Sequence, residues 1–168
     1  MTGCQVKVLV TVINRQNCGQ PEQLYRDVRD QGITYLKFIP LQARDNPESI
    51  TDRQWAAFLM AVFDVWVRED IGRIFIQLFD STLEIWRGNP QQSDCGAIPD
   101  ECRACPIRSL CSSDSPEQRG EGKSALCAGY QAFFRHSAPH MRVMRDLIRH
   151  HRSPVELMAL LQQSHRVS

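Results

Sequence analysis

Four cysteines in the C-terminal half place the strongest constraint on how this chain folds. They are Cys102, Cys105, Cys111 and Cys127, at the spacing C-x2-C-x5-C-x15-C. A close pair of thiols followed by two more is typical of a chain that wraps zinc or an iron–sulfur cluster in four sulfur ligands. Spacing leaves both kinds of centre open. Either one requires the four thiols to converge, although fifteen residues separate the last from the others.

Composition limits the remaining choices. The 168 residues suffice for one ordinary domain, and a net charge of +1 gives no strong field toward nucleic acid or membrane. No apolar run approaches the roughly 18 residues of a membrane span, and no signal peptide is visible, so we expect a cytoplasmic protein. Seven cysteines there predict metal ligation rather than disulfides. We interpret Cys4 and Cys18 as ordinary thiols and leave Cys95 open.

The N-terminal half alternates between strand and helix patterns. Lys7 to Asn14 is a valine-rich run that predicts a strand buried on both faces of a parallel sheet. A helix is expected from Pro21 to Gly32, followed by a strand from Thr34 to Leu41. Together they predict a right-handed βαβ unit.

Later segments continue this pattern. Thr51 to Asp70 predicts a helix with a Thr51–Gln54 capping box, Arg73 to Phe79 a strand, and Ser81 to Trp86 a short helix. A polar loop over 88–96 leads into a cysteine module over 94–128. Helix resumes near residue 129, and a capping box with Pro154 in the first turn predicts a last helix from about residue 153.

These patterns predict an α/β fold in which a partial parallel (β/α) barrel fragment is followed by a small helical cysteine-rich module. The expected domains are 1–93, the late part of a barrel, and 94–168, the cysteine module with the C-terminal helices. A sheet with only the late strands leaves an edge open, so a homo-oligomer, another chain or rearranged helices are expected to cover it.

Other reactive side chains have simpler interpretations. Cys18 is expected to be a loop thiol rather than a nucleophile. His136 and His140 could serve as alternative zinc ligands, but Pro139 between them argues against a regular shared face, so we interpret them as surface histidines. The basic stretch is interpreted as a solvated helix face beside an apolar one; it comprises Arg142, Arg145, Arg149, His150, His151 and Arg152.

Two stretches also resemble a known family. The sequences PDECRACPIRSLCSSDSP and LCAGYQAFFRHSAPHMRVM resemble the C-terminal cluster domain, called SPASM, of the anaerobic sulfatase-maturating enzymes. These are radical S-adenosylmethionine (radical SAM) proteins. ITYLKFIPLQARD resembles their late barrel strand, with Lys37 where glutamine is common. The segment from Trp55 to Asp80 is similar too, and the resemblance runs from Val6 to about Met158.

The resemblance implies a chemistry and also shows what is missing. Family members cleave S-adenosylmethionine at one 4Fe–4S cluster, oxidise a sulfatase Cys or Ser to formylglycine, and hold two auxiliary clusters. It implies that Cys102, Cys105, Cys111 and Cys127 ligate the second auxiliary cluster. The radical-generating C-x3-C-x2-C is absent from this sequence. Ser115 replaces a cysteine of the other auxiliary cluster, and the segment with its remaining ligands and a catalytic aspartate is absent.

We therefore expect a truncated maturase-like protein that is not a self-sufficient radical SAM enzyme. It would keep one auxiliary 4Fe–4S site and an accessory or binding role, and S-adenosylmethionine binding lacks its motif. One alternative is half of an active maturase completed by a partner chain. Another is a zinc-stabilised interaction or regulatory module. The expected partners are a sulfatase or a complementary maturase chain, with no nucleic acid and no membrane.

Overall fold

The computed structural model describes residues 6–43, 45–89 and 126–166. In this part, three parallel strands form a sheet in the order β1-β2-β3. The strands are β1 (Val8–Ile13), β2 (Tyr35–Pro40) and β3 (Phe75–Ile76). β1 and β2 pair in register from Val8↔Tyr35 to Ile13↔Pro40. The predicted α/β class and parallel βαβ unit are confirmed. The domain boundary between residues 93 and 94 lies outside the described residues and stays a prediction.

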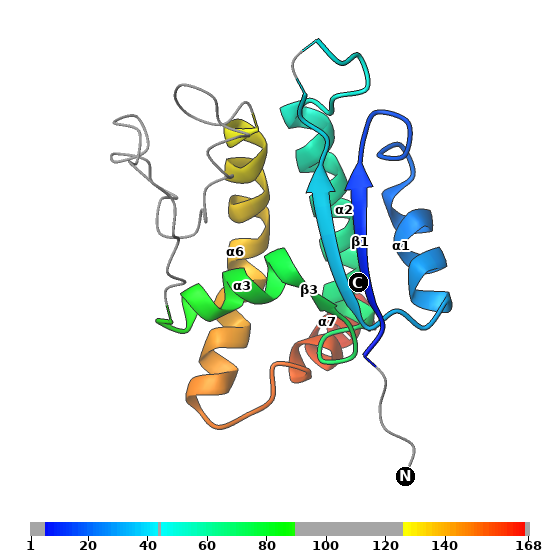
Figure 1. Ribbon diagram of the computed structural model, residues 1–168. Helices are drawn as coiled ribbons and strands as arrows, with labels where there is room; N and C mark the ends of the chain where they lie inside the picture. Colours follow the sequence, from blue (N-terminus) through cyan, green and yellow to red (C-terminus); the bar gives the residue numbers. More distant parts are fainter. Residues whose placement is uncertain (1–5, 44, 90–125, 167–168) are drawn as a thin grey trace.

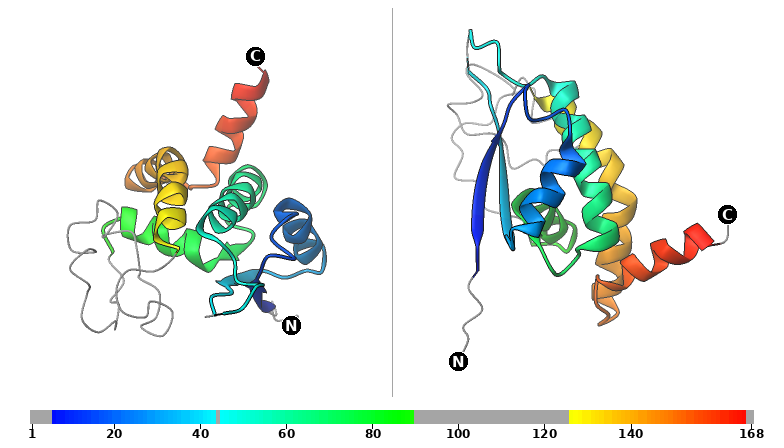
Figure 2. Two further views of the ribbon diagram at one scale, coloured as in Figure 1. Left: turned by 90° about the horizontal axis from the view of Figure 1, so that it is seen from above. Right: turned by 90° about the vertical axis from the view of Figure 1, so that its right-hand side faces the viewer.

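Helices cover one side of the sheet, as Figures 1 and 2 show. The two crossover helices are α1 (Pro21–Asp30) and α2 (Asp52–Glu69), and the others are α3 (Gln77–Trp86), α6 (Cys127–Arg149) and α7 (Glu156–Arg166). α2 lies between the sheet and α6, and α6 contributes to the same hydrophobic core. Among the described residues, no helix is both long enough and apolar enough to cross a membrane.

The predicted capping box of α2 is confirmed. The Gln54 backbone N–H donates to Thr51 Oγ1 at 3.2 Å, and the Thr51 N–H donates to Gln54 Oε1 at 3.0 Å. Both bonds satisfy helix-end donors that would otherwise have no partner. The predicted C-terminal glycine of α1 is also confirmed, because Gly32 has φ +79°, a conformation that strains other residues.

Two element predictions are wrong. The strand expected over residues 73–79 is only two residues long, because the chain turns into α3 at Gln77. Asp80 explains the early turn: its Oδ2 accepts the Ile76 N–H at 2.9 Å and so satisfies a donor at the start of α3. The expected last helix is present as α7, but it begins at Glu156, and the expected capping box differs: the Glu156 carboxylate pairs with Arg152 at 2.7 Å.

The expectation that β1 is buried on both faces is also wrong. Val8, Val10 and Val12 are 57%, 52% and 47% exposed. Side chains alternate across a strand, and residues paired in parallel register share a face. We call this uncovered side the open face; its residues are Val8, Val10, Val12, Tyr35, Lys37, Ile39 and Phe75. Leu36 and Ile76, on the other side, are buried under helices.

A substitution at Gly129 tests the packing of α6 on α2. A Cβ at this position would lie 2.5 Å from the Asp52 backbone oxygen, so the two helices approach more closely than any side chain allows. Gly129→Ala should lower the free energy of unfolding by about 1–3 kcal/mol, although alanine normally favours a helix. Urea denaturation measures the loss.

Gly19→Ala is the matched control, since a Cβ there meets nothing within 4 Å. It should change the free energy of unfolding by less than about 0.5 kcal/mol. A Gly129→Ala protein as stable as wild type would contradict this close helix contact.

Candidate functional site

Of the four cysteines predicted to form the metal site, the structure describes only Cys127. Cys102, Cys105 and Cys111 lie outside the described residues, so their convergence with Cys127 stays a prediction. Cys127 is the first residue of α6 and is half-buried. The Gln131 side-chain amide donates to its Sγ at 3.6 Å. A helix N-terminus and an amide donor both favour negative charge on sulfur, and such charge is what a metal-ligating thiolate carries.

The position of Cys127 is set by the core beneath it. Leu126 is buried, and Phe133 and Phe134 in the next turns of α6 are buried as well. Tyr130 contacts Trp55 of α2 edge to face, with ring centroids 6.2 Å apart. The aromatic packing and the close approach at Gly129 therefore anchor the start of α6 to α2. A ligand at Cys127 thus sits on a rigid support.

The two histidines share a face of α6, contrary to our expectation. α6 continues through Pro139, and both rings lie against Phe63, with centroids 6.2 Å away for His136 and 5.7 Å for His140. His136 Nε2 lies 2.7 Å from Asp64 Oδ1, which links α6 to α2. Burial lowers the pKa of His140. Within the described ranges, no three His, Cys, Asp or Glu side chains form a metal-binding group.

A buried carboxylate at the end of α2 has a structural role. Asp70 is 0% exposed, and its Oδ2 accepts hydrogen bonds from Tyr25 Oη at 2.7 Å and from Arg29 at 3.0 Å. Burial raises the pKa of Tyr25, so the phenol keeps its proton and acts as the donor. These bonds join α1 to α2 and compensate the buried charge. Sequence alone did not single out Asp70, because its partners lie more than 40 residues away.

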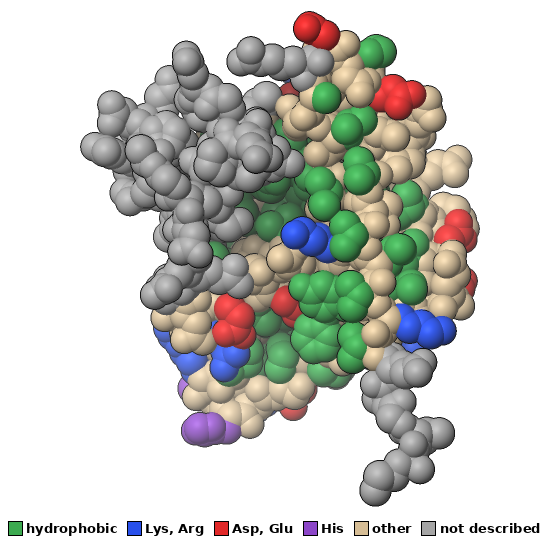
Figure 3. All heavy atoms as spheres, viewed as in Figure 1, with side chains coloured by type: hydrophobic (Ala, Val, Ile, Leu, Met, Phe, Trp, Pro, Cys, Tyr) green, Lys and Arg blue, Asp and Glu red, His purple; other side chains and the backbone are tan. Residues whose placement is uncertain are grey.

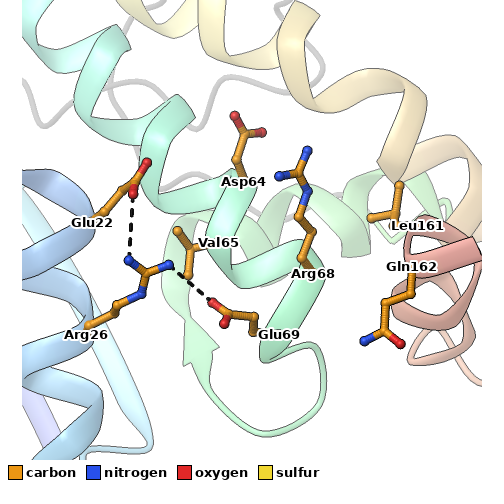
Figure 4. Close-up of a pocket in the computed structure, with 8 residues that line it drawn as sticks. All are labelled: Glu22, Arg26, Asp64, Val65, Arg68, Glu69, Leu161 and Gln162. Atoms are coloured by element: carbon orange, nitrogen blue, oxygen red, sulfur yellow. Dashed lines mark ion pairs between the residues drawn. The ribbon is translucent and has the colours of Figure 1, made fainter. Parts of the chain in front are cut away.

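The open face is visible in Figure 3, where hydrophobic side chains gather over β1 and β2. Figure 4 shows a second feature, a groove of about 400 Å³ between α1, α2 and α7. Charged side chains dominate its lining and pair with one another: Arg26 lies 3.7 Å from Glu22 and 3.8 Å from Glu69. These pairs are exposed and contribute little stability, and they offer no concentrated charge to a ligand.

Asp80 is a second acidic residue that the sequence patterns did not single out. Burial raises its pKa to about 7, the Ile76 N–H opposes this shift, and Glu84 adds to it. No pattern predicted it, because the residue fell between the strand expected over residues 73–79 and the helix expected over residues 81–86. The carboxyl is protonated below about pH 7 and becomes an unfavourable partly buried charge above it.

Comparisons with known proteins identify relatives of this chain. The chain is 45% identical to the uncharacterised protein YidF of Escherichia coli over 159 residues, which is 90% of each chain. It is 24% identical to the serine-type anaerobic sulfatase-maturating enzyme of Bacteroides thetaiotaomicron, across 91% of this chain and 57% of that enzyme. The cysteine-type enzyme of Clostridium novyi is 26% identical over 95 residues, covering 52% of this chain and 25% of that one. No protein-family model matches the chain.

Solved structures agree on the fold. The histidine-tagged form of anSMEcpe with bound AdoMet matches with a TM-score of 0.69 at 17% identity, over 82% of this chain and 54% of that one. The native anSMEcpe with AdoMet and the Kp18Cys peptide gives 0.68 at 16% identity, over 82% of this chain and 57% of that one. This chain thus spans about half the length of the sulfatase-maturating enzymes it matches.

Asp80→Asn tests the buried carboxyl. The folded pKa of about 7 exceeds the ordinary 3.8, so the folded protein binds a proton more tightly than the unfolded chain. The stability of wild type should therefore fall as the pH rises from about 4 to above 7. Asn keeps an oxygen for the Ile76 N–H and carries no charge. At pH 8 it should be more stable than wild type by roughly 2 kcal/mol, allowing for partial solvent access.

Urea denaturation of both proteins at pH 5 and pH 8 measures this difference. Asp30→Asn is the matched control, because its side chain is 76% exposed, and its effect should be the same at both pH values. An Asp80→Asn effect that does not grow between pH 5 and pH 8 would show that the carboxyl titrates normally.

Proposed function

Because the chain belongs to the family of the Escherichia coli protein YidF and is homologous to the anaerobic sulfatase-maturating enzymes, we propose that it is an iron–sulfur accessory protein. In this proposal it holds one auxiliary 4Fe–4S cluster and does not generate a radical by itself. The residues that would hold the cluster are Cys102, Cys105, Cys111 and Cys127. When bound, such a cluster supplies one-electron transfer.

The observation that carries the proposal is the setting of Cys127. Cys127 is the first residue of a helix that is anchored to the main core, and the Gln131 side-chain amide donates a hydrogen bond to its sulfur. Hydrogen bonds to cluster sulfurs and partial burial are the means by which a protein tunes a cluster's potential. The one described ligand therefore fits the group, and the chain's own role is to hold and orient it.

Two observations support the absence of independent radical chemistry. The sequence contains no C-x3-C-x2-C, the three-thiol arrangement that leaves one iron open for S-adenosylmethionine. The alignment with the Bacteroides enzyme extends over 235 positions, more than the 168 residues of this chain. That enzyme therefore has residues inside the aligned region without a counterpart here. We propose a sulfatase or a complementary maturase chain as the partner.

Anaerobic reconstitution with iron and sulfide tests the cluster. Wild type should bind roughly four iron and four sulfide ions per chain, with visible absorption and, after reduction, an electron paramagnetic resonance signal. Cys127→Ser should lose most of both ions. The matched control is Cys18→Ser, in the loop between β1 and α1, which should retain them. Stoichiometric zinc without sulfide would instead support the zinc-stabilised module, and retention of the cluster by Cys127→Ser would contradict the proposed ligand set.

Reductive cleavage of S-adenosylmethionine tests the enzyme question. The reconstituted and reduced chain should form no 5′-deoxyadenosine above background, because a cluster with four cysteine ligands has no open iron position. A full-length sulfatase-maturating enzyme in the same assay provides the positive control. Turnover by this chain alone, abolished by Cys111→Ala, would make it an enzyme. Turnover only with a second maturase chain would support the partner-completed alternative.

A further inference from the structure

The open face of the sheet carries a surface that the proposed cluster does not explain. Three valines of β1 alternate along it at about half exposure, and Phe75 of β3 is 51% exposed. Single exposed apolar residues are ordinary, but a contiguous row on neighbouring strands marks an interaction surface. Figure 3 shows hydrophobic side chains gathered on this side of the molecule, with a basic side chain among them.

The strand at the margin of this surface carries none of the usual sequence features that discourage pairing. Edge strands usually carry lysine, proline, a bulge or an inward charge that discourages contact with other chains. β1 reads VLVTVI and has none of these, and among the described residues it pairs with β2 alone. Its sequence therefore suits contact with another polypeptide rather than exposure to water.

One charge interrupts the open face and limits what can bind there. Lys37 lies on the central strand, in register with Val10, and its side chain is exposed. It makes no ion pair with any other residue that the structure describes. An ammonium group covered by an apolar surface loses its hydration, so a bound partner must supply a counter-charge.

This charge argues against a second copy of the chain stacked face to face. A twofold axis through the centre of the face would bring two Lys37 side chains together, and the residues that form the face include no carboxylate. Like charges in a desolvated interface oppose binding. The polypeptide that binds here must therefore present a surface different from the open face itself.

We propose that the open face docks a segment of another protein that is mainly aliphatic or aromatic and carries one Asp or Glu, whose carboxylate pairs with Lys37. The valines and Phe75 supply the apolar contact, and Lys37 selects the partner and sets its register. This inference goes beyond the proposed function. It does not depend on the cluster, because all of the residues that carry it lie on the three strands.

Selection from a displayed library of random linear peptides tests the proposal on the full chain. Peptides enriched on wild type should contain an Asp or Glu flanked on both sides by aliphatic or aromatic residues. For the best synthetic peptide, Lys37→Glu should weaken binding about tenfold or more. Replacing the acid of that peptide by lysine should restore binding to Lys37→Glu, which a merely structural role for Lys37 would not produce.

Lys7→Glu is the matched control, since it makes the same charge change next to Val8 but on the opposite side of the strand. It should alter the affinity less than about twofold. Val10→Ser should abolish binding while circular dichroism shows an unchanged fold. Selected peptides without an acid, equal effects of the two lysine variants, or sedimentation showing a dimer that Val10→Ser dissociates would each overturn the proposal.

Discussion

Burial of α2 on two sides is the constraint on which the rest of this structure depends. Phe63 lies at the centre of the packing, with ring contacts to Phe79 of α3 at 5.2 Å and Phe133 of α6 at 5.8 Å. On the sheet side, Phe58 meets Phe38 of β2 at 5.1 Å. Aromatic clusters of this kind bury large areas and hold their rings in specific edge-to-face arrangements. One helix thus joins the sheet to the C-terminal helices.

The same packing connects the core to the proposed cluster. The start of α6 is held where Gly129 passes the Asp52 backbone and Tyr130 meets Trp55. Cys127 lies two residues before that contact and so has little freedom of position. A ligand supported by a packed core is a preorganised one, and preorganisation is what a metal or cluster site requires of its scaffold.

The sheet belongs to a fold shared with a solved sulfatase-maturating enzyme structure, and no described helix covers one of its sides. The chain shares its fold with anSMEcpe over 82% of its length, at a TM-score of 0.69. The open face is apolar, and its single lysine stands where the family resemblance leads one to expect glutamine. Partner binding at the open face and binding of the proposed cluster involve different parts of the chain: the first involves the three strands, and the second involves the cysteines.

Local patterns determined most of the secondary structure. The apolar spacing and Thr51–Gln54 capping box located α2, and the valine run located β1, because these signals act over a few neighbouring residues. Tertiary packing decided the rest. The valine run predicted a strand but could not say that, in the part of the chain that the structure describes, no helix covers one of its faces, since coverage depends on distant segments. Asp80 ended β3 through its bond to Ile76, and burial by distant segments raised its pKa. The cysteine spacing predicted a ligand set, but only packing against Asp52 and Trp55 decided where Cys127 sits.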